Sequence, residues 1–271
     1  MIRSVFYVSD GTGITAETLG HTLLTQFEQV AFQQMSLPFI NSEEKVDWAV
    51  QRINRAAEAE GARPLVFSTL IDAHLRTRLG ECQGAVFDFF DTFTGAMEQE
   101  LGVHAQRVAG RSHGMGNVRT YSERIDALHY AIQNDDGATV RDYPMADVVV
   151  MGVSRAGKTP TCMYLALTYG IRAANYPLAD DDFENASLPA ALEPYRHKLF
   201  GLTVDPERLH QIRNERRPGS RYASMEQCLY ELQGAERLFK REGIPCLNIT
   251  QRSVEEISAQ LMQQAGLKRR I

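Results

Sequence analysis

The sequence has few cysteines, no long apolar run and no excess of positive charge, and each absence argues against a class of protein. The four cysteines are too scattered for a structural zinc site or a disulfide framework; they are Cys82, Cys162, Cys228 and Cys246. We therefore expect reduced thiols and a cytoplasmic location. No apolar run approaches the roughly 18 residues that cross a membrane, and the N-terminal stretch "MIRSVFYVSDGTG" does not resemble a signal peptide.

The charge balance also argues against a general nucleic-acid-binding protein. Lysine and arginine total 29 against 34 aspartates and glutamates, so the chain carries a net charge of -5. With 44% hydrophobic and 23% charged residues among 271, the composition is that of a globular protein with a substantial core.

Short apolar segments alternate with helical patterns along the whole chain. In the first half, strands are expected at residues 4–8, 64–70 and 84–90, with a helix over 43–61 that Gly61 would end. Strands are likewise expected at residues 148–151, 171–178, 198–204 and 244–249 of the second half. This alternation predicts an α/β protein with mainly parallel sheets.

The composition changes between residues 107 and 142, where glycine, arginine and polar residues gather. We place a domain boundary near residue 142, with an N-terminal α/β domain over 1–142 and a P-loop kinase-like domain over 143–271. Arg111 and His113 lie in this connecting region. They would contact phosphate across the interface, although a single histidine is more often structural.

The stretch "GVSRAGKT" follows the apolar run "VVVM" and precedes a helical pattern that begins at Lys158. Its spacing is that of a phosphate-binding loop, in which backbone N–H groups and the helix N-terminus face phosphate oxygens. Lys158 would contact the terminal phosphates, and the Thr159 hydroxyl would bind Mg²⁺. An ordinary strand-to-helix turn is the alternative. The predicted nucleotide-binding residues are Gly152, Val153, Ser154, Arg155, Ala156, Gly157, Lys158 and Thr159.

Other candidate residues follow predicted strands or helices. Arg155 would either neutralise phosphate charge or cover the loop. Asp205 would be a metal-side carboxylate of the Walker-B kind, and the triple aspartate at 180–182 would face metal or substrate or else form a solvated loop. The segment "RNERRPGSRY" at 213–222 would close over phosphates as a lid, or would simply end a solvated helix. "SDGTG", with Ser9 and Thr12, would form an anion-binding turn or a capped helix entry.

Several of these segments together resemble one protein family. They include "VFYVSDGTGITAETLGHTLLTQF", "GVSRAGKTPTCMYLALTYGIRAANYPLADDD", "HKLFGLTVDPERL" and "ERRPGSRYAS", in this order over nearly the whole chain. The sequence is similar to the bacterial phosphoenolpyruvate synthase regulatory proteins, relatives of the pyruvate, phosphate dikinase regulatory proteins. "SDGTGITAETLG" resembles the synthase branch more than the dikinase branch.

The resemblance implies two opposed activities. One is an ADP-dependent protein threonine kinase that inactivates phosphoenolpyruvate synthase. The other is a phosphorylase in which inorganic phosphate removes the phosphoryl group from phosphothreonine and pyrophosphate is released. From the chemistry, Lys158 and Arg155 would neutralise charge, and Asp182 would orient or deprotonate the attacking group. A homodimer is plausible.

Two other functions remain open on the residues alone. A small-molecule P-loop kinase of the shikimate or adenylate kinase type would explain the second half and leave the first half unexplained. A nucleotide-responsive switch that binds a partner without modifying it is the other, although no GTPase-type base-specificity motif is present.

Overall fold

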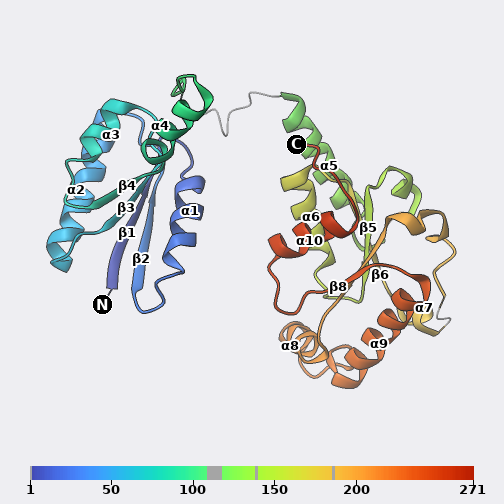
Figure 1. Ribbon diagram of the computed structural model, residues 1–271. Helices are drawn as coiled ribbons and strands as arrows, with labels where there is room; N and C mark the ends of the chain where they lie inside the picture. The colour runs from blue at the N-terminus through green and yellow to red at the C-terminus, as the bar shows by residue number, and fades with distance from the viewer. Residues whose placement is uncertain (1, 109–117, 138–139, 185–186) are drawn as a thin grey trace. The chain divides into compact units, whose positions relative to one another are not determined.

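The computed structural model describes residues 2–108, 118–137, 140–184 and 187–271, and the chain forms two compact units (Figure 1). The units are Met1–Gly116 and Asn117–Ile271. Each contains a four-stranded parallel sheet covered by helices, so the predicted α/β class is confirmed.

The sheet of the first unit has the order β2-β1-β3-β4. Its strands are β1 (Ile2–Val8), β2 (Ala31–Leu37), β3 (Leu65–Ser68) and β4 (Ala85–Asp88). Its helices are α1 (Ile14–Leu24), α2 (Glu43–Glu60), α3 (Ala73–Leu79) and α4 (Phe89–Leu101). Helix α2 ends at Gly61, whose φ of 60° is left-handed, as predicted.

Two local predictions for this unit differ from the structure. Strand β2 was not predicted, because it is an edge strand with mostly exposed side chains and has no apolar run. The predicted strand at 84–90 ends at Asp88, whose carboxylate accepts a hydrogen bond from the N–H of Asp91 and so starts helix α4. The apolar residues Phe89 and Phe90 therefore lie on a helix.

The sheet of the second unit has the order β6-β5-β7-β8. Its strands are β5 (Val148–Gly152), β6 (Ala173–Pro177), β7 (Leu199–Thr203) and β8 (Cys246–Asn248). Its α-helices are α5 (Val118–Gln133), α6 (Lys158–Tyr169), α7 (Asp180–Glu184), α8 (Pro206–Arg216), α9 (Met225–Glu242) and α10 (Val254–Gln264). Its 3-10 helices are η1 (Asp135–Gly137), η2 (Val140–Met145), η3 (Glu193–Lys198) and η4 (Arg221–Ala223).

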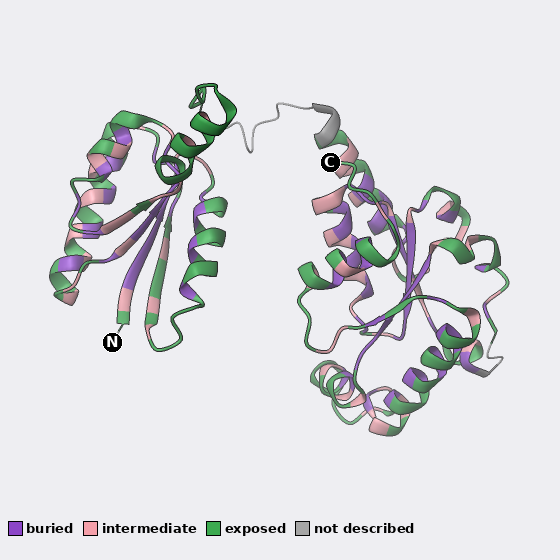
Figure 2. Cartoon of the chain, in the orientation of Figure 1, coloured by how far each residue is buried: buried purple, intermediate pink, exposed green. Residues whose placement is uncertain are grey.

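The helices of this unit form two layers, one on each face of the sheet. Helices α5, α6 and α10 pack together on one face, and α7, α8 and α9 pack together on the other (Figure 1). Strands β5 and β7 are buried along their whole length between these layers (Figure 2). Ser253 and Glu256 form a capping box at the start of α10.

The division between the units lies earlier than the sequence predicts. Helix α5 packs against α6, and the carbonyl of Asn134 beyond it accepts a hydrogen bond from Asn175 of β6. The second unit therefore begins at residue 117, and the predicted boundary near residue 142 falls inside it. In the described part of the chain, no helix is long and apolar enough to cross a membrane.

Candidate functional site

The segment predicted to bind phosphate connects strand β5 to helix α6 at the carboxyl edge of the second sheet. Gly152 ends the strand, and a side chain there would place its Cβ 2.7 Å from the backbone oxygen of Leu202. Gly157 has a φ of 69° and Arg155 a φ of 75°, both left-handed. These values give the loop the tight curl that its glycines predict. Val153 and Ala156 are fully buried beneath it.

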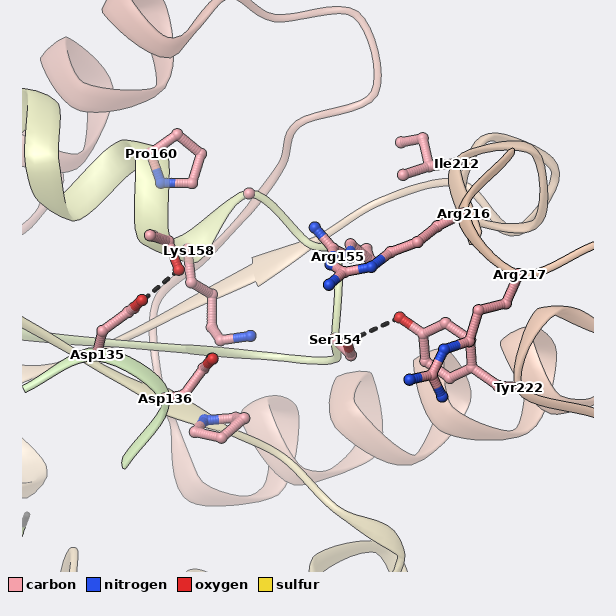
Figure 3. A pocket seen from close by; sticks show the side chains of 13 residues that line it. Asp135, Asp136, Ser154, Arg155, Lys158, Pro160, Ile212, Arg216, Arg217 and Tyr222 are labelled. Carbon is pink, nitrogen blue, oxygen red and sulfur yellow. Dashed lines mark hydrogen bonds between the residues drawn. The ribbon is translucent and has the colours of Figure 1, made fainter. Parts of the chain in front are cut away.

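A cleft of about 740 Å³ opens beside this loop (Figure 3). Four parts of the second unit line it: the loop with the start of α6, the segment around η1, the end of β6, and the end of α8 with the residues that follow. The lining residues are Asp135, Asp136, Ser154, Arg155, Gly157, Lys158, Thr159, Pro160, Pro177, Ile212, Arg216, Arg217 and Tyr222.

Lys158 lies at the N-terminus of α6 and is almost completely buried. Its Nζ donates a hydrogen bond to the carbonyl of Val153 at 3.0 Å. Burial lowers the pKa of Lys158 to about 8, while the nearby charges of Asp136 and Asp135 oppose that shift. The lysine is therefore mostly cationic at neutral pH and poorly solvated, so an entering phosphate would gain a strong electrostatic contact.

Two aspartates that sequence reasoning missed face this lysine. Asp135 accepts a hydrogen bond from the Thr159 hydroxyl at 2.8 Å and another from the side-chain amide of Asn175. Asp136 has a left-handed φ of 54°, and its N–H donates to Asn175 Oδ1 at 2.9 Å. In Figure 3 the Lys158 side chain extends toward Asp136. The two consecutive aspartates before Gly137 are the sequence signal for these carboxylates, but they lie in the segment that the composition predicts as a connection between domains.

The Thr159 hydroxyl and the Asp135 carboxylate suit Mg²⁺, which binds proteins through one or two oxygen side chains and otherwise through substrate phosphates and water. Among the described residues, no three histidine, cysteine, aspartate or glutamate side chains could hold a metal ion together. The pair of Thr159 and Asp135 supplies two oxygen ligands, and a bound phosphate would supply others.

The opposite side of the cleft is basic. Arg216 and Arg217 come from the end of α8, and Arg155 from the loop extends toward them (Figure 3). The Tyr222 hydroxyl and Ser154 Oγ are hydrogen-bonded at 2.8 Å. In the described part of the chain, four cationic side chains and two carboxylates line the cleft, which suits a polyanionic ligand. The segment predicted as a lid thus supplies cleft residues.

Arg213, in the same segment, does not line the cleft but lies beneath it, fully buried and ion-paired with Glu231. Burial acts to lower the pKa of Arg213, but its hydrogen bonds to Glu231 and the charge of that residue outweigh burial, so the pKa is above its usual value. Arg213 is therefore a permanent cation in the interior.

The structure does not bring the other predicted carboxylates into the cleft. Asp182 accepts a hydrogen bond from the N–H of Ala179 at 2.9 Å, and burial raises the pKa of its carboxyl. Asp205 precedes helix α8, and its side chain accepts from the Asn248 amide at 2.8 Å. Neither residue is among those that line the cleft.

The N-terminal glycine-rich loop is held by one local hydrogen bond and one to a distant segment of the same unit. Ser9 Oγ accepts from the N–H of Gly11 at 3.2 Å, and Asp10 accepts from Ile71. Helix α1 begins after Gly13, with no side-chain cap from the exposed Thr12 or from any other residue described. The predicted phosphate contacts Arg111 and His113 lie outside the described residues.

The comparisons with known proteins cover both units of the chain, and all point to one family. A family model described as kinase/pyrophosphorylase matches residues 5–262. A protein of Pseudomonas fluorescens (strain Pf0-1) is 52% identical over 270 residues, covering 100% of this chain and 99% of the relative. A Marinobacter nauticus protein is 51% identical over 269 residues, covering 99% of each chain. A Hahella chejuensis protein is 51% identical over 271 residues, covering 100% of each. All three are named "Putative phosphoenolpyruvate synthase regulatory protein".

Proposed function

Because this chain belongs to the kinase/pyrophosphorylase family, we propose that it regulates phosphoenolpyruvate synthase by adding and removing a phosphoryl group on a threonine of that enzyme. In the forward reaction, the threonine hydroxyl attacks the β-phosphorus of ADP, and AMP leaves with the oxygen of the broken P–O–P bond. In the reverse reaction, inorganic phosphate attacks the phosphothreonine, and pyrophosphate and the free hydroxyl are the products.

The observation that carries this proposal is the composition of one cleft. Arg155, Lys158, Arg216 and Arg217 bring four positive charges to a loop whose N–H groups and helix terminus also favour phosphate. Both reactions need the same arrangement, because each transfers a phosphoryl group between two oxygen atoms and develops the same type of charge. Positioning and charge neutralisation supply most of the rate enhancement in such transfers. A single site therefore suffices for both directions.

The two aspartates take different roles in this scheme. Asp135 is already held by Thr159 and Asn175, so Asp135 and Thr159 would bind Mg²⁺, which supplies charge neutralisation on the phosphates. Asp136 lines the cleft beside Lys158 and is the carboxylate that we assign as the proton acceptor for the attacking hydroxyl. This assignment replaces Asp182, which does not line the cleft.

The test uses purified phosphoenolpyruvate synthase charged with its own phosphoryl group. It is incubated with this protein and either ADP or ATP, and phosphorylation sites are then mapped by mass spectrometry. We expect new phosphothreonine with ADP, and its loss with release of pyrophosphate when inorganic phosphate is added. A target that stays unmodified with both nucleotides would contradict the proposal and would favour a metabolite kinase or a non-modifying switch.

A pair of lysine variants connects the reaction to the cleft. Lys158→Ala removes the buried cation and should lower both rates about 100-fold or more. Lys240→Ala, an exposed lysine of helix α9 in the same unit, should leave them unchanged. Equal rates in the two variants would show that the reaction does not depend on the cleft.

A further inference from the structure

Arg213 of helix α8 is the largest fully buried side chain described, and its guanidinium contacts three separate segments of the second unit. Glu231 of α9 accepts two hydrogen bonds, at 2.6 and 3.0 Å. The carbonyl of Ser154 in the loop accepts two more, from Nη2 at 3.0 Å and from Nε at 3.3 Å. The carbonyl of Tyr222 accepts one at 3.1 Å. These bonds match the five N–H donors of an arginine.

The ion pair with Glu231 alone does not account for this arrangement. Glu231 balances the buried charge of Arg213, as the interior requires. The remaining three N–H groups are directed at the backbone carbonyls of two cleft residues, Ser154 in the loop and Tyr222 in the lid segment. The guanidinium also lies 4.3 Å from the centre of the Tyr222 ring. One side chain therefore joins the loop to the lid segment.

The anchored carbonyl determines how the loop presents its backbone. In a trans peptide the C=O and N–H groups point in opposite directions. Because the Ser154 carbonyl is held toward Arg213, the N–H of the same peptide, which belongs to Arg155, is directed away from it. Arg155 has a left-handed φ of 75° and lines the cleft, whereas Arg213 does not.

We propose that Arg213 is a positioning residue for the phosphates of a nucleoside diphosphate. Glu231 holds its guanidinium rigidly. The guanidinium in turn holds the Ser154 and Tyr222 carbonyls, and so sets the loop and the lid segment in the geometry that binds those phosphates. The hydrogen bond between the Tyr222 hydroxyl and Ser154 Oγ completes the same connection above the guanidinium. The inference rests on the proposed nucleotide site and adds a residue that makes no contact with the ligand.

The test replaces the buried pair with apolar side chains, since such replacements often leave stability unchanged or improve it. Full-length Arg213→Met/Glu231→Leu protein is titrated with ADP by calorimetry, and its melting temperature is measured. A matched control is Arg196→Met/Glu242→Leu, a more exposed ion pair at 2.8 Å in the same unit, neither of whose residues lines the cleft. Calorimetry reports the dissociation constant and the number of sites separately, so partial unfolding lowers the site number without changing the affinity.

We expect the Arg213 double variant to bind ADP at least about tenfold more weakly at full site number, equivalent to about 1.4 kcal/mol. The KM for ADP should rise accordingly, with that for the protein substrate unchanged. The control should bind like the wild type. A folded double variant with wild-type affinity would overturn the inference, as would a reduced site number at unchanged affinity. Absence of ADP binding by the wild-type protein would instead refute the nucleotide site itself.

If the double variant does not fold, Arg213→Lys provides the second measurement. The lysine keeps the charge opposite Glu231 but has one donor group in place of the fork that reaches both carbonyls. Its affinity for ADP should still fall by at least about tenfold, and wild-type affinity in this variant would likewise overturn the inference.

Discussion

The buried lysine of the cleft should make nucleotide binding depend on pH above neutrality. Burial holds the pKa of Lys158 at about 8 in the free protein, against an ordinary value near 10.4. A phosphate beside the ammonium group favours the charged form, so the pKa rises on binding. Below pH 8 the free protein already carries the proton. Above pH 8 the proton must be taken up on binding, so the affinity falls as the pH rises.

The size of the effect follows from the protonated fraction. With a pKa of about 8, roughly 90% of Lys158 is charged at pH 7 and roughly 10% at pH 9. The association constant for ADP should therefore fall about tenfold between these values, or about 1.4 kcal/mol, provided that the bound lysine keeps its proton. The terminal phosphate of ADP loses its last proton near pH 6, so its own ionisation changes the affinity little between pH 7 and pH 9.

Calorimetry at pH 7, 8 and 9, in two buffers with different ionisation enthalpies, measures both the affinity and the proton uptake. Uptake should approach one proton per site at pH 9. Lys158→Arg is the control, because an arginine stays charged throughout and its affinity should not change with pH. A flat profile in the wild type, or the same fall in the arginine variant, would refute the assignment of the titration to Lys158.

Three substitutions test other features of the second unit. Gly152→Ala places a methyl group 2.7 Å from the Leu202 carbonyl and should lower the free energy of unfolding by about 1–3 kcal/mol, measured with urea; an unchanged midpoint would contradict the packing argument. Arg155→Gly should leave that free energy within about 1 kcal/mol, because relief of the left-handed φ offsets the flexibility of glycine. Its affinity for ADP should nevertheless fall, and unchanged binding would remove this guanidinium from the site. Glu231→Gln leaves the Arg213 charge buried without its partner and should lower the free energy of unfolding, measured with urea, by about 3 kcal/mol. A loss no larger than that for an exposed ion pair would show that the Arg213–Glu231 pair is not desolvated.

The features that the sequence predicted correctly have signals within a few residues of one another. Gly61 follows directly on the helix that it ends. The glycines of the loop between β5 and α6 lie within one short stretch, from Gly152 to Thr159, and the strand–loop–helix order predicted there is present. Phosphate binding by this loop stays a prediction. The family resemblance extends the same kind of local evidence over the whole chain.

The features that the sequence did not predict depend on contacts between distant segments. Strand β2 is recognisable only by its pairing with β1, since its exposed side chains have no apolar pattern. Helix α5 belongs to the second unit because it packs on α6. Helix α5 lies in the segment whose composition predicts a connection, so its packing determined the unit boundary.

The same distinction separates the two halves of the candidate site. The sequence by itself determined the loop with Lys158 and Thr159, because backbone conformation and helix start are local properties. Only the tertiary structure placed Asp135 beside Thr159, 24 residues away, and showed that Asp182 does not line the cleft. It also placed Arg213 against Ser154, 59 residues away. The packing of η1 against β6 brings Asp135 to the cleft, and a buried ion pair with Glu231 holds Arg213; both are contacts between segments far apart in the chain.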